Sequence, residues 1–185
     1  MIYSWEKIVR HSIPLLTLCV LIEIFAGQIL QSNQQKLLLF PIFLISIPVI
    51  NGVSGNIGSI LGARLASGLH LGVIELTIKD KNMQKNFITS LFMGLITYSL
   101  LAILIYYITY IGNIEMNIGL VEFVSIVLGT GMLLILIISV VSVLTAFLSF
   151  KKGLDPDDMV APVVTTVGDT LGIVFLFILI GVVGV

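Results

Sequence analysis

The fold is decided by the stretch APVVTTVGDTLG at residues 161–172, which lies in an apolar run from about Met159 to Val185 that holds one acid, Asp169. A helix that starts near Asp157 places Asp169 ~18 Å along its axis, at ~1.5 Å per residue. That depth is about half of a ~30 Å hydrocarbon core. A carboxylate there is costly, and such residues usually face a polar interior or an ion path. The stretch therefore predicts a membrane-spanning helix with a functional acid.

The composition places the whole chain in a membrane. Of its 185 residues, 58% are hydrophobic and 10% are charged, which is far more apolar than a soluble core requires. We therefore expect an all-α membrane protein with one membrane domain, residues 1–185, and no soluble sensor domain. No basic run is present that would hold a nucleic acid. The single cysteine, Cys19, rules out an internal disulfide, and no Cys/His spacing indicates a bound metal cofactor.

Five apolar segments are each long enough to cross a bilayer, which takes ~20 residues. The first is predicted to be a retained anchor helix, because residues 26–28 make a poor signal-peptide cleavage site. The second is predicted to be broken by its prolines and glycines, which are Pro41, Pro48, Gly52, Gly55, Gly58 and Gly62. The expected spans are residues 13–30, 37–71, 87–111, 121–150 and 159–185.

Basic residues predict the orientation of these spans. With the N-terminus in the cytoplasm, eight of the nine Lys and Arg residues fall on the cytoplasmic side, and only Lys36 falls outside. Such a bias is the positive-inside pattern of a multi-pass protein of the cell membrane. Five spans then place the C-terminus outside.

The second segment contains NGVSGNIGSILGAR at residues 51–64, for which two readings stay open. Gly58-x-x-x-Gly62 is a small-residue motif that lets two helices pack closely. Alternatively, an interrupted helix frees carbonyl oxygens for an ion, as transporters do at membrane depth. Asn51 and Asn56 favour a role facing a pore, because close packing does not require amides.

The fifth segment starts with the acidic cluster Asp155, Asp157 and Asp158. Asp155 before Pro156 can cap the free N–H groups of a helix, and the next two acids suit the positive end of its dipole. The same three carboxylates could instead bind or concentrate cations at a membrane entrance. The residue types alone do not separate these alternatives.

Helical spacing connects the acidic cluster to the buried acid. Asp158 and Asp169 are 11 residues apart, nearly three turns, so they share one side of the helix. Thr165 lies on the same stripe, and Thr166 lies beside it. We expect a polar stripe from the cytoplasmic mouth to mid-membrane. The alternative role for Asp169 is a buried pair with a base, for which Arg64 is the candidate.

Glu23, about ten residues into the first span, is a weaker signal. It is either a second carboxylate on the ion path or an acid bonded to a neighbouring helix. All candidate ligands carry oxygen, which suits Mg²⁺, Mn²⁺ or Ca²⁺ better than Zn²⁺ or copper. One deep acid among neutral oxygens and small residues fits a largely hydrated Mg²⁺ best.

Two motifs resemble the membrane domain of the MgtE family of magnesium channels and transporters, including its eukaryotic solute-carrier relatives. The first is Pro48 followed by SGNIG at residues 54–58 and ARLA at residues 63–66. The second is DPDD at residues 155–158, then Pro162, then TTVGD at residues 165–169. The five-span layout agrees. In place of the family's usual glutamine after Gly-Asn, this chain has Ser59 and Ile60.

The resemblance implies that the second and fifth helices line a pore and that Asp169 contacts the transported Mg²⁺. It also implies a homodimer, because the solute-carrier relatives join two such five-helix units in one chain. The resulting candidate ligands are Asp169, Thr165, Thr166, Asn51, Asn56, Asp155, Asp157, Asp158 and Glu23.

Divalent-cation transport is thus the leading hypothesis. A membrane-embedded metal-dependent enzyme acting on a lipid head group at the cytoplasmic face is the alternative, although no nucleophile–base pair supports it. A non-catalytic membrane subunit would leave the midplane acid without a purpose. The residues do not distinguish a channel from a carrier, import from export, or one coupling ion from another.

Overall fold

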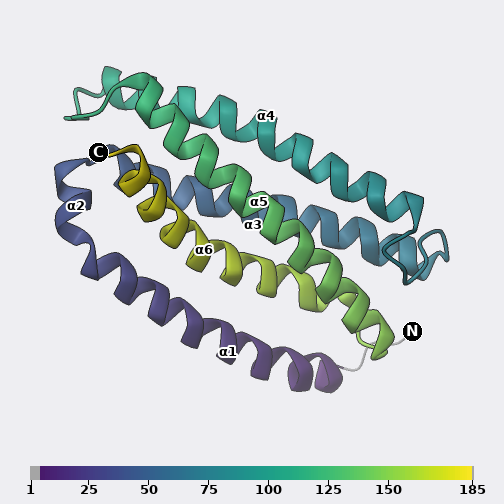
Figure 1. Cartoon of the computed structure of the whole chain (residues 1–185). Helices are drawn as coiled ribbons and strands as arrows, with labels where there is room; N and C mark the ends of the chain where they lie inside the picture. The colour runs from purple at the N-terminus through teal and green to yellow at the C-terminus, as the bar shows by residue number, and fades with distance from the viewer. Residues whose placement is uncertain (1–4, 185) are drawn as a thin grey trace.

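The computed structural model describes residues 5–184 and consists of helices joined by short loops (Figure 1). Five of its helices are long and apolar enough to cross a membrane, and α2 is a short sixth. The predicted end of the last span, Val185, lies outside the described residues. The helices are α1 (Trp5–Ser32), α2 (Gln34–Leu39), α3 (Ile42–His70), α4 (Lys81–Ile111), α5 (Leu120–Lys151) and α6 (Pro156–Val183).

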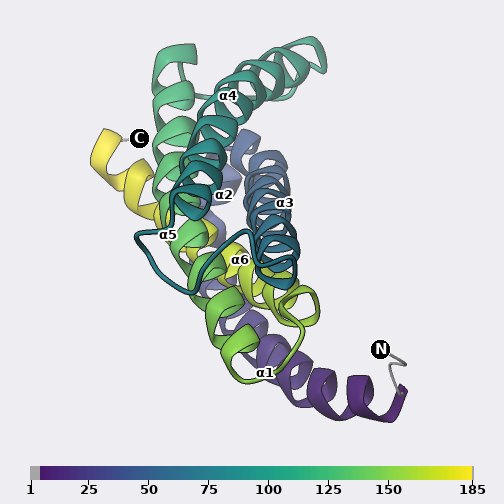
Figure 2. The same cartoon turned by 90° about the vertical axis from the view of Figure 1, so that its right-hand side faces the viewer.

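The helices are arranged around a central group formed by α3, α5 and α6, which all contact one another. Helix α4 packs against α3 and α5 on one side of this group, whereas α1 runs along α6 on another side (Figures 1 and 2). Apart from the short α2, α6 is the only helix that α1 contacts. Much of α1 therefore remains exposed in a single chain.

The two ends of the bundle differ in what they hold. The described start of the chain lies at the same end as the 71–80 loop and the α5–α6 turn, and the C-terminus lies at the opposite end (Figure 1). In the 71–80 loop, Asp80 caps α4 by accepting a hydrogen bond from the Met83 amide at 2.7 Å. That bond holds the pKa of the Asp80 carboxyl below its ordinary value.

Of the breaks predicted in the second span, only the one next to Pro41 is found, and those at Pro48 and the glycines after it are not. Helix α3 continues without interruption from Ile42 to His70 and contains Pro48. The chain instead leaves helical order at Phe40, between α2 and α3, just before Pro41. Pro48 removes a single backbone donor near the start of a long helix, and the turns on either side hold the helix together. The expectation of carbonyls freed by a broken helix at residues 48–62 was therefore wrong.

Glycines of α3 and α6 serve close helix packing. A Cβ atom on Gly58 would lie 2.5 Å from Ile138 Cγ2 and 3.0 Å from Val164 Cβ, so only glycine fits at that position. Gly62 likewise faces Val160 of α6. On α6, Gly168 faces Ser54 of α3, and a Cβ atom added to Gly168 would lie 2.6 Å from Ser54 Oγ. The packing alternative for Gly58 and Gly62 is thus confirmed.

We predict that Gly58→Ala lowers the free energy of unfolding by about 1–3 kcal/mol, because the added methyl group overpacks the contact with Ile138 and Val164. The matched control is Gly181→Ala in α6, where nothing lies within 4 Å of the new Cβ. The control should be neutral or stabilising by up to about 1 kcal/mol, since alanine restricts the unfolded chain. Unfolding in mixed micelles of rising dodecyl sulfate content measures both. Equal effects of the two substitutions would contradict the packing account.

Candidate ion site between α3 and α6

Asp169 lies midway along α6 and is half-buried, with α3 as its neighbour. Asn51 Nδ2 of α3 donates a hydrogen bond to the backbone oxygen of Asp169 at 3.2 Å. The two residues, 118 positions apart in the chain, are therefore in direct contact. Two of the predicted ligands, from the two helices expected to form the site, thus lie together.

The side chain of Asn51 keeps one oxygen unpaired. Asn51 is only 7% exposed, and its Oδ1 atom has no hydrogen-bond partner among the described residues. That oxygen faces Gly172, one turn beyond Asp169, where any side chain would collide with it. Buried acceptors are nearly always satisfied, so this one calls for an explanation. An amide oxygen held beside a carboxylate can accept a hydrogen bond from a water molecule of a hydrated cation.

Glu23 adds a second carboxyl group to this region. Its Oε1 atom accepts a hydrogen bond from Thr166 Oγ1 at 3.1 Å, which links α1 to α6. Thr166 is almost fully buried, whereas Glu23 is exposed in a single chain. Thr166 precedes Asp169 by three residues, so this bond places Glu23 about one helical turn from Asp169. The structure thus shows Glu23 bonded to a neighbouring helix and also near Asp169.

Thr165 lies on the accessible side of α6. Its hydroxyl donates back to the carbonyl oxygens of Ala161 and Pro162, at 2.9 and 3.0 Å. The oxygen atom still has a lone pair to offer, since a hydroxyl accepts as well as donates. Asp158 is exposed and Asp169 half-exposed on the same stripe. The predicted polar stripe of Asp158, Thr165 and Asp169 is therefore accessible along α6.

Asn56 is not directed into the contact that holds Asn51. It is exposed on α3, whereas Asn51 is buried against α6. Five helical residues separate the two amides, a rotation of about 140°, so they cannot face the same neighbour. Asn56 therefore presents its amide on the outer surface of the single bundle.

The acidic cluster at the start of α6 has a structural role in part. Asp155 caps the helix, accepting a hydrogen bond from the Asp157 amide at 3.1 Å, as one alternative predicted. His70 Nε2 lies 3.8 Å from the same Asp155 oxygen. Asp157 and Asp158 are exposed in the first turn. Among the side chains that the structure describes, no three of His, Cys, Asp or Glu are grouped so as to hold a metal ion.

The alternative of a buried Asp169–Arg64 pair is not formed. Arg64 is exposed six residues before the end of α3, and within the described part of the chain Asp169 makes no ion pair with it. Among the described residues, no base therefore neutralises the Asp169 charge. It remains available to a cation.

Two residues that support Asn51 were not among the predicted ligands. Ser54 Oγ donates to the Asn51 backbone oxygen at 2.7 Å, and Tyr98 of α4 donates through its hydroxyl to the Ile50 oxygen at 2.8 Å. Tyr98 is fully buried, and its ring packs on Gly131. A tyrosine in the middle of an apolar span, at residue 98, was the available signal, because a buried hydroxyl needs a partner.

Comparison with protein families places the chain in a family. A family model described as MgtE, divalent cation transporter, matches residues 47–179. The matched region contains Asn51, Asp169 and both sequence motifs, and covers most of the chain. No solved structure matches the chain. The chain belongs to the MgtE family of divalent cation transporters.

Proposed function

We propose that this divalent cation transporter carries Mg²⁺ along the polar stripe of α6, with Asp169 as the central ion-facing group. The carrying observation is the contact between Asp169 and Asn51, whose Oδ1 atom is buried and unpaired. Thr165, Thr166 and Glu23 contribute further oxygens around it. The membership of a transporter family supports this function and gives no support to the lipid-modifying enzyme.

The donor set favours a hydrated ion. Mg²⁺ gives up its waters reluctantly and often meets proteins through one or two carboxylates. The region offers two carboxyl groups, Asp169 and Glu23, and neutral oxygens such as that of Asn51. Ca²⁺ prefers six to eight direct oxygen ligands, which this region supplies less readily. Mg²⁺ is therefore the proposed cargo, and Mn²⁺ is the nearest competitor.

The acidic residues at the start of α6 complete the proposed path. Asp157 and Asp158 are exposed there, beside the capping Asp155, at the end of the bundle that also holds the 71–80 loop (Figure 1). A group of carboxylates at a pore mouth raises the local cation concentration. We assign them that role, with no fixed metal site.

A homodimer would enclose this path. Asp169, Thr165 and Asn56 are accessible on the surface of one bundle, at a depth where a lipid-exposed charge is costly. Two copies related by a two-fold axis would turn these faces toward each other. The exposed apolar surface of α1 adds area to such an interface.

The protein is proposed to lie in the cell membrane with its N-terminus in the cytoplasm. The 71–80 loop and the α5–α6 turn lie at one end of the bundle, and they hold or adjoin Lys79, Lys81, Lys151 and Lys152 (Figure 1). Lys36 lies in α2 at the other end. Such an asymmetry favours a cytoplasmic position for the lysine-rich end.

For orientation, we predict that a reporter inserted in the 71–80 loop is cytoplasmic and one in the 112–119 loop is external. The physical reason is the bias of basic residues toward the first loop. Paired reporters active only inside or only outside the cell measure this. A reporter that places the 71–80 loop outside would overturn the proposed orientation.

For assembly, we predict that native mass spectrometry of the purified protein detects two copies. One α6 stripe cannot surround an ion, whereas two facing stripes can. If dimers dissociate, the transport rate per protein molecule should depend on the protein density in the liposomes. Transport by particles shown to hold a single copy would contradict the dimer.

For transport, we predict that Asp169→Asn reduces Mg²⁺ flux into liposomes by at least about tenfold, which takes a loss of only ~1.4 kcal/mol of ion stabilisation. Asparagine keeps the size and one oxygen but removes the charge that offsets the lost hydration of a dication. Fluorescent Mg²⁺ indicators inside the liposomes report the flux, and Mn²⁺ and Ca²⁺ are tested in parallel.

Two controls accompany that variant. Glu115→Gln removes an exposed acid in the 112–119 loop and should leave flux unchanged. Asp158→Asn should lower flux only in part, and less so near 1 M salt, where charges are screened beyond ~3 Å. Thermal unfolding establishes that each variant is folded. Parental Mg²⁺ flux through folded Asp169→Asn would show that α6 does not carry the ion.

A further inference from the structure

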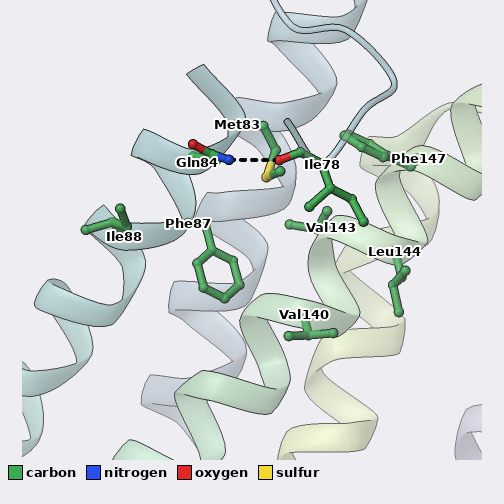
Figure 3. A pocket seen from close by; sticks show the side chains of 9 residues that line it. All are labelled: Ile78, Met83, Gln84, Phe87, Ile88, Val140, Val143, Leu144 and Phe147. Atoms are coloured by element: carbon green, nitrogen blue, oxygen red, sulfur yellow. Dashed lines mark hydrogen bonds between the residues drawn. The ribbon is translucent and has the colours of Figure 1, made fainter. Parts of the chain in front are cut away.

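A groove lies between α4 and α5 (Figure 3), which make no contact with α1 within the described part of the chain. Its volume is about 470 Å³. Phe87 and Ile88 line it from α4, and Val140, Leu144 and Phe147 line it from α5. Gln84 is the single polar side chain in its wall. We call this feature the α4–α5 groove.

The α4–α5 groove is closed at one end by the 71–80 loop. Ile78 of that loop covers the groove, and its backbone oxygen accepts a hydrogen bond from Gln84 Nε2 at 3.1 Å (Figure 3). The one polar side chain of the wall is thereby satisfied. The rest of the groove offers only apolar contacts, and Ile88, Val140 and Leu144 are each about half exposed. On a membrane-spanning surface, an apolar chain fits such a space.

Lysines border the covered end. Lys81 lies three residues before Gln84 and seven before Ile88, on the same side of α4. Lys85 lies three residues before Ile88. On α5, Lys151 lies four residues after Phe147 and continues the stripe that lines the groove.

The charges of these lysines are available to a ligand. Lys79, Lys81, Lys85 and Lys151 are all exposed, and none of them forms an ion pair with a side chain that the structure describes. The nearest acid in sequence, Asp80, accepts from the Met83 amide at 2.7 Å and caps α4. Basic residues above an apolar groove complement a molecule with an anionic head and a hydrocarbon tail.

We propose that the α4–α5 groove binds an anionic phospholipid, with one acyl chain between α4 and α5 and the phosphate head group at Lys81, Lys85 and Lys151. The residues that line the groove belong to α4, α5 and the 71–80 loop, and none of them is among the α3 and α6 residues assigned to the ion path. This lipid therefore occupies a site distinct from the transported ion. Because Lys79 and the loop residue Ile78 adjoin the site, bound lipid holds the 71–80 loop in place.

The head-group arm of the test uses the delipidated full-length protein in native mass spectrometry. It is titrated with phosphatidylglycerol and with phosphatidylcholine carrying the same acyl chains. We expect phosphatidylglycerol to bind about tenfold more tightly or better. The pair Lys81→Gln and Lys85→Gln should weaken it about 25-fold, at about fivefold for each lysine near the membrane surface, and leave phosphatidylcholine unchanged. Lys36→Gln, at the opposite end of the bundle, is the matched control and should have no effect.

The groove arm uses a steric variant. Leu144→Trp should fill the groove and reduce binding of both lipids at the site. Leu133 is an exposed residue of α5 outside the groove, and Leu133→Trp should leave lipid binding at the site unchanged. Thermal unfolding checks that the variants are folded. Equal affinity for the two lipids, an equal loss from Lys36→Gln, or unchanged binding to folded Leu144→Trp would each overturn the proposal. So would a Leu144→Trp variant that turns dimers into monomers with its lipid binding intact, because the groove would then be a subunit interface.

Discussion

The contact between α3 and α6 is the constraint on which the rest of the molecule depends. Glycines on both helices lack the side chains that would keep the helices apart. Gly58 and Gly62 of α3 contact valines of α6. Gly168 and Gly172 of α6 contact Ser54 and Asn51 of α3. The contact brings an amide to the only acid in the middle of α6. Without it, Asn51 would face lipid or another partner and Asp169 would have no neighbour with a free oxygen.

The other helices follow from this pair. Helix α5 packs on both, and the Ser142 hydroxyl of α5 donates to the Gly58 oxygen at 2.9 Å. Helix α4 steadies the Asn51 turn through Tyr98, and α1 brings Glu23 to Thr166. The accessible side of α6 is then left with a carboxylate, Asp169, and a hydroxyl, Thr165, at membrane depth. A surface of that kind is tolerated where it lines a wet path, and this is the basis of the proposed enclosure by a second copy.

The sequence predicted α6 most completely. Its capping Asp155, its start at Pro156 and the accessible stripe to Asp169 all follow from residue types and helical period, and the structure has them. Five spans followed equally from apolar length. The interruption that the sequence predicted within α3 is not found, because Pro and Gly propensities describe an isolated helix. Here the same glycines are the sites where α6 packs, and tertiary contacts outweigh their local cost.

The pairing of Asn51 with Asp169 could not be predicted from the sequence. The two residues are 118 positions apart, and their contact depends on the register between α3 and α6. The different directions of Asn51 and Asn56 could have been predicted from the sequence, since a spacing of five residues in a helix rotates a side chain by about 140°. Glu23 was the least certain of the predicted ligands, yet it is held by a hydrogen bond to α6. The position of Glu23 depends on the contact between α1 and α6. The sequence of α1 alone does not indicate which helix α1 will contact.

The central claim is that the accessible side of α6 lies along the ion path, and ion protection of a thiol at Thr165 tests it most directly. In a Cys19→Ala background, Thr165→Cys is exposed to a water-soluble cationic thiol reagent, with Glu75→Cys in the exposed 71–80 loop as the reference. The account predicts that the reagent reaches the thiol at 165 and that Mg²⁺ slows its modification while the thiol at 75 reacts at the same rate. A thiol at 165 that is unreactive in water, or that reacts at a rate independent of Mg²⁺, would contradict it.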